Sequence, residues 1–345
     1  MSGDGSCAIA GAWNCSPFHA PFQLGGTMRA TMLTFTALIA FGAAVAAALG
    51  AAVTAQDDAR FSARSELVLL DVAVTDDRGG FISGLPGESF QVLEEGRPQK
   101  IAFFAEQDAP ATIGLLIDSS GSMLVNRDRM IAGITALAQA SNPDDEFLPL
   151  VFNERVTRVL DSRVDFTSDP MQLKDALTNN LTVLGKTAFY DALSEAMDGV
   201  GKGTHERRVV IVLSDGGDNA SRLSYDDLVK KVQASNVVIY TIALIDPIAL
   251  GHNAGALRRL AKVTGGLAFE PRTRDLIGNA FRIIAADIRS RYTLAYEPED
   301  TSSGRVKHVR VSVNATDHKD VKVRTRTGYV AGSSETSPTH SEGSR

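Results

Sequence analysis

Cysteine is nearly absent from this chain, whose 345 residues include only Cys7 and Cys15. Both precede the strongest targeting signal of the sequence, so we expect neither in the mature protein. The remaining chain then has no disulfide framework, no zinc site and no catalytic thiol. A body without cysteine is compatible with an oxidising extracytoplasmic space.

An excess of basic residues is also absent, since the formal net charge is −6 and no long run of Lys and Arg occurs. This balance argues against nucleic acid as a partner. The apolar content of 44% and the charged content of 22% are ordinary for a globular protein. The length allows one large domain or two modest ones.

The sequence lacks the motifs of common hydrolases and nucleotide-binding proteins. No Gly-x-Ser-x-Gly elbow occurs. His205–Glu206 begins like a zinc-protease helix, but Val209 stands where the second histidine is needed. The segment Gly185–Thr187 resembles the end of a phosphate-binding loop, but Asn180 occupies the position of the required first glycine. These absences argue against an enzyme.

Residues 28–55 have the pattern of a signal peptide. Arg29 supplies a positive start, an Ala-rich apolar run follows over residues 32–53, and small residues precede Gln56. The run is long enough to span a bilayer, so an uncleaved membrane anchor is the alternative. A mature N-terminus near Gln56 would indicate cleavage. Residues 1–27 are unusual before such a signal and are interpreted as a leader or a mis-assigned start.

The most informative stretch is an apolar run over residues 113–117 that ends in Asp118, Ser120 and Ser122. One carboxylate and two hydroxyls within five residues suit a hard divalent cation such as Mg²⁺. Asp and Ser before a helix are also common as N-caps, so the motif alone leaves both interpretations open.

Two further segments follow in the chain. Thr187 lies in a predicted loop that runs into a helix, and Asp215 follows a second apolar run over residues 209–214. In an open α/β sheet, ligands bind where the carboxyl ends of strands meet, close to the switch in strand order. We therefore expect Asp118 and Asp215 to approach each other at one edge of the sheet.

This ordered set resembles the von Willebrand factor A domain with its metal-ion-dependent adhesion site. The resemblance implies a bound Mg²⁺ or Mn²⁺ that coordinates an acidic residue of a partner protein. The ligand residues that it implies are Asp118, Ser120, Ser122, Thr187 and Asp215. Asp218, Asn219 and Lys186 are candidates for an outer shell, and Lys186 stands where the family usually has Gly. A turn after the strand would explain Asp218 and Asn219 equally well. For Lys186 the alternative is a solvated position in a loop.

Strands and helices alternate over residues 110–290, which predicts an α/β fold with a doubly wound, mostly parallel sheet covered on both faces. Residues 62–108 and 291–330 show the alternation of short strands instead. We expect these two segments to form one small β-sandwich into which the α/β domain is inserted. Such flanks resemble those of secreted bacterial proteins with a von Willebrand A domain. The polar tail, residues 331–345, is predicted to be disordered.

Within the α/β segment, strands are expected near residues 113–118, 147–152, 155–160, 209–214 and 237–245, and helices near 127–140, 171–178, 188–200, 225–234, 255–263 and 275–289.

The sequence thus predicts a secreted or periplasmic protein-binding or adhesion module that is not an enzyme. One alternative is a membrane-anchored subunit of a larger assembly that docks its partner through the same metal site. A metal-dependent hydrolase is the other alternative, although no base, nucleophile or cofactor loop converges with the metal motif.

Overall fold

The computed structural model describes residues 67–106, 108–161, 163–181, 185–245, 252–273, 275–300, 304–315 and 320–332. All of these residues belong to one compact unit. The predictions for residues 1–27 and 28–55, and for most of the tail, fall outside the described residues. Within the described ranges, no helix is both long and apolar enough to cross a membrane.

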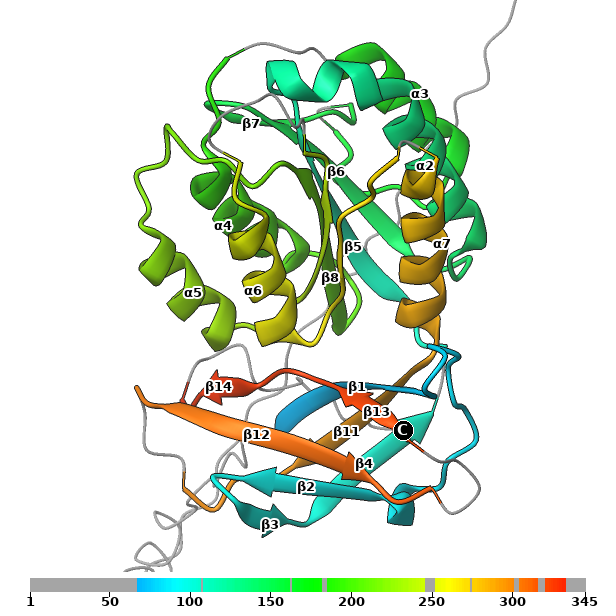
Figure 1. Cartoon of the computed structure of the whole chain (residues 1–345), viewed down its shortest axis with the longest axis vertical. Coiled ribbons are helices and arrows are strands. Elements are labelled where there is room, and N and C mark those ends of the chain that lie inside the picture. The colour runs from blue at the N-terminus through cyan, green and yellow to red at the C-terminus, as the bar shows by residue number, and fades with distance from the viewer. Residues whose placement is uncertain are drawn as a thin grey trace, which may run out of the picture. The chain divides into compact units, whose positions relative to one another are not determined.

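A six-stranded sheet forms the centre of the α/β part, with the strand order β10-β9-β8-β5-β6-β7 (Figure 1). Neighbouring strands are parallel except β6 and β7, which are antiparallel. The strands are β5 (Ala111–Asp118), β6 (Glu146–Phe152), β7 (Val156–Arg158), β8 (Arg207–Ser214), β9 (Val238–Ala243) and β10 (Ala268–Phe269). The predicted doubly wound, mostly parallel sheet is therefore confirmed, while the short β10 was not predicted.

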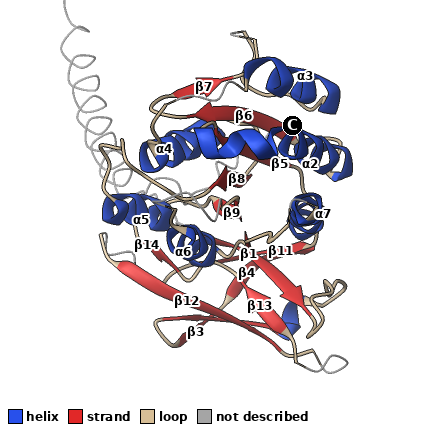
Figure 2. Ribbon diagram, turned by 45° about the horizontal axis from the view of Figure 1, so that its top comes forward, coloured by secondary structure: helices blue, strands red, loops and turns tan. Residues whose placement is uncertain are grey.

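Helices cover both faces of this sheet, as Figures 1 and 2 show. The helices α2, α3 and α7 pack on one face, and α4, α5 and α6 pack on the other. Their bounds are α2 (Arg127–Ala140), α3 (Pro170–Asn180), α4 (Phe189–Val200), α5 (Tyr225–Ala234), α6 (Ala254–Thr264) and α7 (Leu276–Arg289). All six lie within two residues of the ranges expected from the sequence.

Local capping explains several of these bounds. The Asp169 carboxylate accepts the Met171 N–H, and Pro170 occupies the first turn of α3. The Ser224 hydroxyl accepts the Asp227 N–H at the start of α5. The helix α6 ends at Gly265, which has a positive φ of 78° and is left-handed. These side chains satisfy backbone groups that a helix end leaves without partners.

The strand β5 is buried on both faces, which is why its sequence is a continuous apolar run. Ile113, Leu115 and Ile117 join the core beneath α2 and α7. Leu116 points the other way, into the core beneath α4. Register pairs Ile117 with Leu213 of β8 and with Val151 of β6. Because β6 lies on one side of β5 and β8 on the other, the carboxyl end of β5 lies at the switch in strand order.

The two flanks form a β-sandwich, as predicted. One sheet has the order β13-β1-β11-β4 and the other the order β14-β12-β2-β3, so each sheet combines strands from both flanks. The strands are β1 (Val68–Thr75), β2 (Phe90–Glu94), β3 (Arg97–Gln99), β4 (Ile101–Glu106), β11 (Arg291–Tyr296), β12 (Val306–Val313), β13 (Lys322–Arg324) and β14 (Gly328–Val330). A separate apolar core, which includes Leu70, Val92 and Leu294, lies between them.

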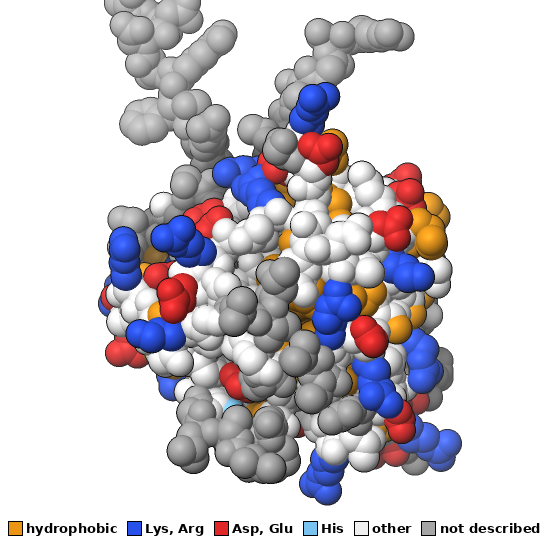
Figure 3. Space-filling view, turned by 90° about the horizontal axis from the view of Figure 1, so that it is seen from above, with side chains coloured by type: hydrophobic (Ala, Val, Ile, Leu, Met, Phe, Trp, Pro, Cys, Tyr) orange, Lys and Arg blue, Asp and Glu red, His pale blue; other side chains and the backbone are white. Residues whose placement is uncertain are grey.

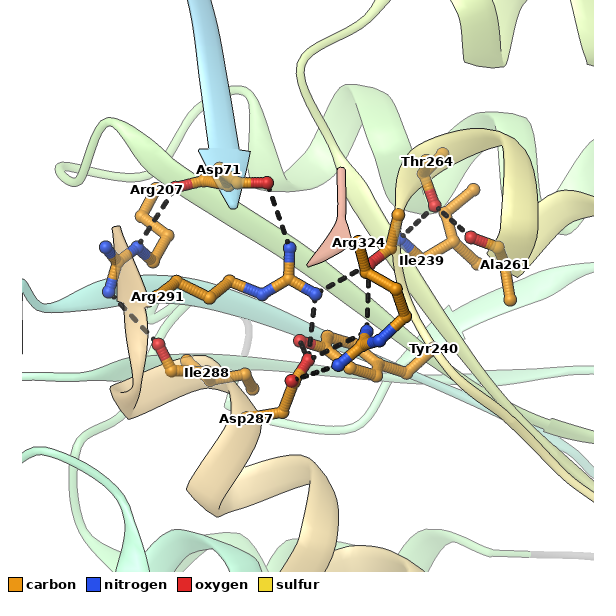
Figure 4. A network of polar contacts seen from close by, with 11 residues as sticks. Asp71, Arg207, Ile239, Tyr240, Ala261, Thr264, Asp287, Ile288, Arg291 and Arg324 are labelled. Atoms are coloured by element: carbon orange, nitrogen blue, oxygen red, sulfur yellow. Dashed lines mark hydrogen bonds and ion pairs between the residues drawn. The ribbon is translucent and has the colours of Figure 1, made fainter. Parts of the chain in front are cut away.

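A buried ion network joins the sandwich to the α/β part (Figure 4). Asp287 of α7 is fully buried and accepts the Tyr240 hydroxyl at 2.6 Å and Arg291 Nη2 at 2.8 Å. Arg324 of β13 donates to both oxygens of the same carboxylate. Arg291 and Arg324 also donate to the Gly265 carbonyl, at 2.7 and 3.0 Å. One carboxylate therefore holds groups from β9, β11 and β13.

Replacing Asp287 by Asn tests this network. Burial alone raises the pKa of the Asp287 carboxyl, but the guanidinium groups of Arg291 and Arg324 hold the pKa below its ordinary value of 3.8. We expect Asp287→Asn to lower the free energy of unfolding by about 3–5 kcal/mol at pH 7, because it leaves buried cations unpaired. Because the pKa of Asp287 is lower in the folded state, its ionised carboxylate contributes its full stabilisation above the unfolded-state pKa of about 3.9. That stabilisation is lost as the pH falls from there through the lower pKa of the folded state.

Urea unfolding between pH 7 and pH 3 measures this difference, with the exposed Asp226→Asn on α5 as the control. A stability difference that stays constant across this pH range would contradict the assignment of the effect to the ionised carboxylate.

Two helical glycines test how tightly α2 packs on α7. A methyl group at Gly133 of α2 would lie 2.3 Å from Phe281 Cδ2, whereas one at Gly278 of α7 would meet nothing within 4 Å. Gly133→Ala is expected to lose about 1–2 kcal/mol, because overpacking outweighs the gain in helix propensity. Gly278→Ala is expected to gain about 0.5–1 kcal/mol. Urea midpoints that shift in the same direction for both variants would contradict this packing.

Candidate metal-binding site

Asp118 lies at the carboxyl end of β5 and is fully buried. Its Oδ1 accepts the Ser120 backbone N–H at 2.8 Å, and its Oδ2 accepts the Ser214 hydroxyl at 2.8 Å. Since Ser214 is the last residue of β8, the carboxylate bridges the ends of two adjacent strands. Its orientation is therefore fixed by the sheet itself.

The turn after Asp118 is fixed by the neighbouring strand β6. Both the backbone N–H and the hydroxyl of Ser119 donate to the Phe152 carbonyl, at 2.8 and 2.9 Å. Ser120 is buried, and its carbonyl accepts the Met123 N–H at 3.0 Å. A 3₁₀ helix over Gly121–Asn126 follows and leads into α2. The side chain of Ser122, in this helix, lies outside what the structure describes.

Thr187 lies in the loop before α4 and is buried. Its N–H donates to Asn219 Oδ1 at 2.9 Å, and its carbonyl accepts the N–H groups of Asn219 and Ala220. The next residue, Ala188, donates its N–H to the carbonyl of Asn153, directly after β6. These backbone bonds tie the Thr187 loop to the segments that follow β6 and β8.

Asp215 is half-buried in the loop after β8, and its Oδ1 accepts the Gly217 N–H at 2.9 Å. The Ser214 hydroxyl accepts the Gly216 N–H at 3.0 Å. Gly216 has a φ of 78°, and a Cβ there would lie 2.5 Å from the Asn253 carbonyl oxygen. Only glycine fits this turn without strain, and the turn sets where Asp215 leaves the strand.

The three outer-shell candidates have different roles in the structure. Asn219 positions the Thr187 loop through the hydrogen bonds above. Asp218 accepts the Ser221 hydroxyl and, at 3.3 Å, the Tyr190 N–H in the first turn of α4. Lys186 is exposed, and its backbone N–H donates to Glu154 Oε1 at 3.3 Å. The Asp218 carboxylate thus accepts a backbone N–H of the first turn of α4, and its place in an outer shell stays a prediction.

Sequence reasoning missed three polar residues that hold this region together. Ser214 and Asn153 act as described above. The carboxylate of Asp191 in α4 accepts the N–H groups of Arg222 and Leu223, both at 2.9 Å. A serine closing an apolar strand is a signal that could have indicated Ser214, whereas no local pattern marks a long-range acceptor such as Asp191.

The electrostatics of Asp118 favour a nearby cation. Burial raises the pKa of its carboxyl above 3.8, the hydrogen bonds from Ser120 and Ser214 oppose this, and the charge of Asp215 adds to the rise. Among the described residues, no group of three or more His, Cys, Asp and Glu could hold a metal ion. The predicted site brings two carboxylates and otherwise hydroxyl oxygens, and such hard donors suit Mg²⁺ or Mn²⁺.

The carboxyl ends of the strands point away from the sandwich, toward the face seen in Figure 3. Across the described part of this face, Lys and Arg side chains alternate with Asp and Glu side chains, mostly around the periphery. Uncharged side chains and backbone fill much of the middle.

The family model described as the von Willebrand factor type A domain matches residues 112–282. This range spans β5 to α7 and includes all five residues predicted as metal ligands. No curated protein matches the sequence of the chain.

Several solved structures are similar to it. An aerotolerance-related membrane protein from Bacteroides fragilis is 15% identical, with 52% of this chain and 98% of that chain covered and a TM-score of 0.42. A von Willebrand factor type A protein from Catenulispora acidiphila is 14% identical, with 79% and 74% covered and a TM-score of 0.44. The corresponding domain of the pilus tip protein Mfa5 from Porphyromonas gingivalis is 14% identical, with 53% and 96% covered and a TM-score of 0.42.

Asp191→Ala tests how the loop after β8 is held. The variant removes the acceptor of two backbone N–H groups, which we expect to cost about 1–3 kcal/mol in the free energy of unfolding. Amide hydrogen exchange at Arg222 and Leu223 should accelerate, because local opening becomes easier. Glu195→Ala, an exposed position on the same helix, is the control. Unchanged exchange at these two amides in Asp191→Ala would contradict the role given to this carboxylate.

Proposed function

Because residues 112–282 form a von Willebrand factor type A domain, we propose that this chain is a non-enzymatic protein-binding module of adhesion type. It acts outside the cytoplasm and uses a divalent cation at the strand ends of the domain. A cation held there would supply the position at which an Asp or Glu side chain of a partner protein binds. Domains of this family are commonly modules of protein interaction, and the metal site makes that role specific for carboxylates.

One observation carries the proposal: the Asp118 carboxylate is buried at the switch in strand order, held by Ser120 and Ser214 and raised in pKa partly by Asp215. In our proposal Ser120, Ser122 and Thr187 hold Mg²⁺ or Mn²⁺ through their hydroxyls, while Asp118 and Asp215 act largely through water. When bound, the cation supplies a positive charge and an exchangeable coordination position. Its site has few direct carboxylates, which leaves that charge available to an acidic ligand.

Side chains around the site hold its predicted ligand residues in position. Ser119 and Ser214 use their hydroxyls to fix the strand ends, since one donates to Phe152 and the other to Asp118. The side-chain oxygen of Asn219 accepts the backbone N–H of Thr187 and so keeps Thr187 in place. These side chains serve to preorganise oxygen ligands, which supports binding as the function in preference to hydrolysis.

The extracytoplasmic location rests on residues 28–55, which we assign as a cleaved signal peptide. The alternative, an uncleaved anchor, would make the same module the exposed part of a membrane-bound assembly. Both arrangements present the metal site to partners on the same side of a membrane, so the binding chemistry is common to them.

Calorimetry with Mg²⁺ and Mn²⁺ tests the metal site. The wild type should bind one cation, and Asp118→Ala and Thr187→Val should bind it at least about tenfold more weakly. Thr187→Val removes the hydroxyl while its shape and the backbone bonds to Asn219 and Ala220 remain. Cation at about 100 times its Kd should also stabilise the wild type by about 2.7 kcal/mol, but not the variants.

The matched control is Asp128→Ala, at a fully solvated carboxylate in the first turn of α2. It should bind the cation like the wild type. A folded wild type that binds neither cation, or an Asp118→Ala protein that binds as well as Asp128→Ala, would refute the metal site. A peptide array in which each Asp and Glu is paired with Asn and Gln then tests the partner. Binding that does not require Mg²⁺ or the carboxylate would refute the adhesion mechanism.

A further inference from the structure

A cavity of about 510 Å³ lies at the opposite end of the α/β part from the metal site. One wall is the sandwich sheet, through β1, β4 and β11, and the other is formed by the starts of β8 and β9 with the ends of α5 and α6. Its volume falls within the usual range of small-molecule sites, about 300–1,000 Å³. The cavity thus lies between the sandwich and the α/β part.

Most of its lining is apolar. Leu69 of β1, Ala295 of β11 and Val238 of β9 contribute to it. Phe103 of β4 also lines the cavity, although half of its surface is exposed to solvent. An apolar group bound in the cavity would cover the exposed half of this aromatic ring and remove it from water.

Arg326 places a buried cation in the wall of this cavity. Its side chain lines the cavity, and the residue is only 7% exposed. It donates to the carbonyls of Gly328 and Gln233 and to the amide oxygen of Asn236. None of these partners is charged. Burial lowers the pKa of Arg326 to about 10, since desolvation penalises its charge.

The arginines around the cavity differ in the partners that they have. Among the described residues of this junction, Arg207 pairs with Asp71, while Arg291 and Arg324 share Asp287. Arg326 forms no ion pair there. The charged residues that line the cavity are Asp71, Glu206, Arg207 and Arg326. Arg326 is the buried cation among them whose hydrogen-bond partners are all uncharged.

We propose that this cavity binds a small amphipathic molecule with an apolar body and one carboxylate, of the fatty-acid class, whose carboxylate is attracted by Arg326. The apolar walls receive the hydrocarbon, and a guanidinium in low dielectric attracts the anionic end. Three of the five N–H donors of Arg326 are used by the protein, so two remain for a ligand among the contacts described. This site is separate from the metal site and goes beyond the proposed adhesion function.

Fluorescence titration of the full chain with 11-(dansylamino)undecanoic acid tests the cavity. The wild type should bind this probe saturably, with a blue shift of its emission. Ala105→Trp on β4 fills the cavity from its wall and should weaken binding at least about tenfold. Ala102→Trp is the matched control, because Ala102 lies on the same strand but is exposed and does not line the cavity. It should bind the probe within about twofold of the wild type.

Competition with dodecanoic acid and dodecan-1-ol tests the role of charge. The acid should displace the probe at least about tenfold better than the alcohol from the wild type, because a charge-assisted hydrogen bond is lost in the alcohol. Arg326→Gln should abolish this preference, and Arg326→Lys should restore part of it. Folding of each variant is checked by circular dichroism, and the lysine variant separates loss of charge from loss of structure.

Three results would overturn the proposal. The wild type could fail to bind the probe, as expected if another part of the chain fills the cavity. Ala105→Trp could bind like Ala102→Trp, which would place the probe elsewhere. The acid and the alcohol could displace the probe equally well, which would remove Arg326 from recognition.

Discussion

The buried carboxylate of Asp287 is the contact on which the joining of the two parts of this chain depends. It sits near the end of α7, the last helix of the α/β part, and binds arginines that belong to β11 and β13 of the sandwich. A carboxylate in a dry interior is costly unless it is paired and hydrogen-bonded. Here the tyrosine of β9 and the two guanidinium groups meet that requirement together. This one carboxylate therefore ties α7 and β9 of the α/β part to two strands of the sandwich.

The same principle operates at the far end of the sheet with a different result. Asp118 is as deeply buried as Asp287, but its partners are an amide and a hydroxyl in place of guanidinium groups. Neither of these compensates a full negative charge, which is why burial raises the pKa of Asp118 while the pKa of Asp287 is lowered. One buried acid is thus neutralised by arginines of the fold, and the other is the acid at which we propose that a cation binds.

Much of the fold could be predicted from the sequence because burial leaves a direct pattern. The unbroken apolar run of β5 and the alternation in β12 record two-sided and one-sided burial, and helix bounds follow capping residues such as Ser224. The short strands β3 and β10 were not predictable, since three and two residues carry too little periodicity. At the site, the candidate ligands could be named from their order in the chain. The supports Asn153 and Asp191 could not, because their contacts join segments distant in sequence.

The way in which the α/β part is inserted determines how the protein carries mechanical load. The chain enters that part from β4 and returns through β11, and these two strands are hydrogen-bonded neighbours, with Glu106 opposite Tyr292. Tension applied where the carboxyl ends of β5 and β8 lie therefore reaches the sandwich through two covalent connections, one to β4 and one to β11. Both connections are pulled in the same direction. The β4–β11 ladder then moves as one unit, and the shear falls on the ladder between β11 and β1, from Val68 and Tyr296 to Ala73 and Arg291. A ladder loaded in shear must break many hydrogen bonds together, so this topology resists a force that acts between the α/β part and the start of β1.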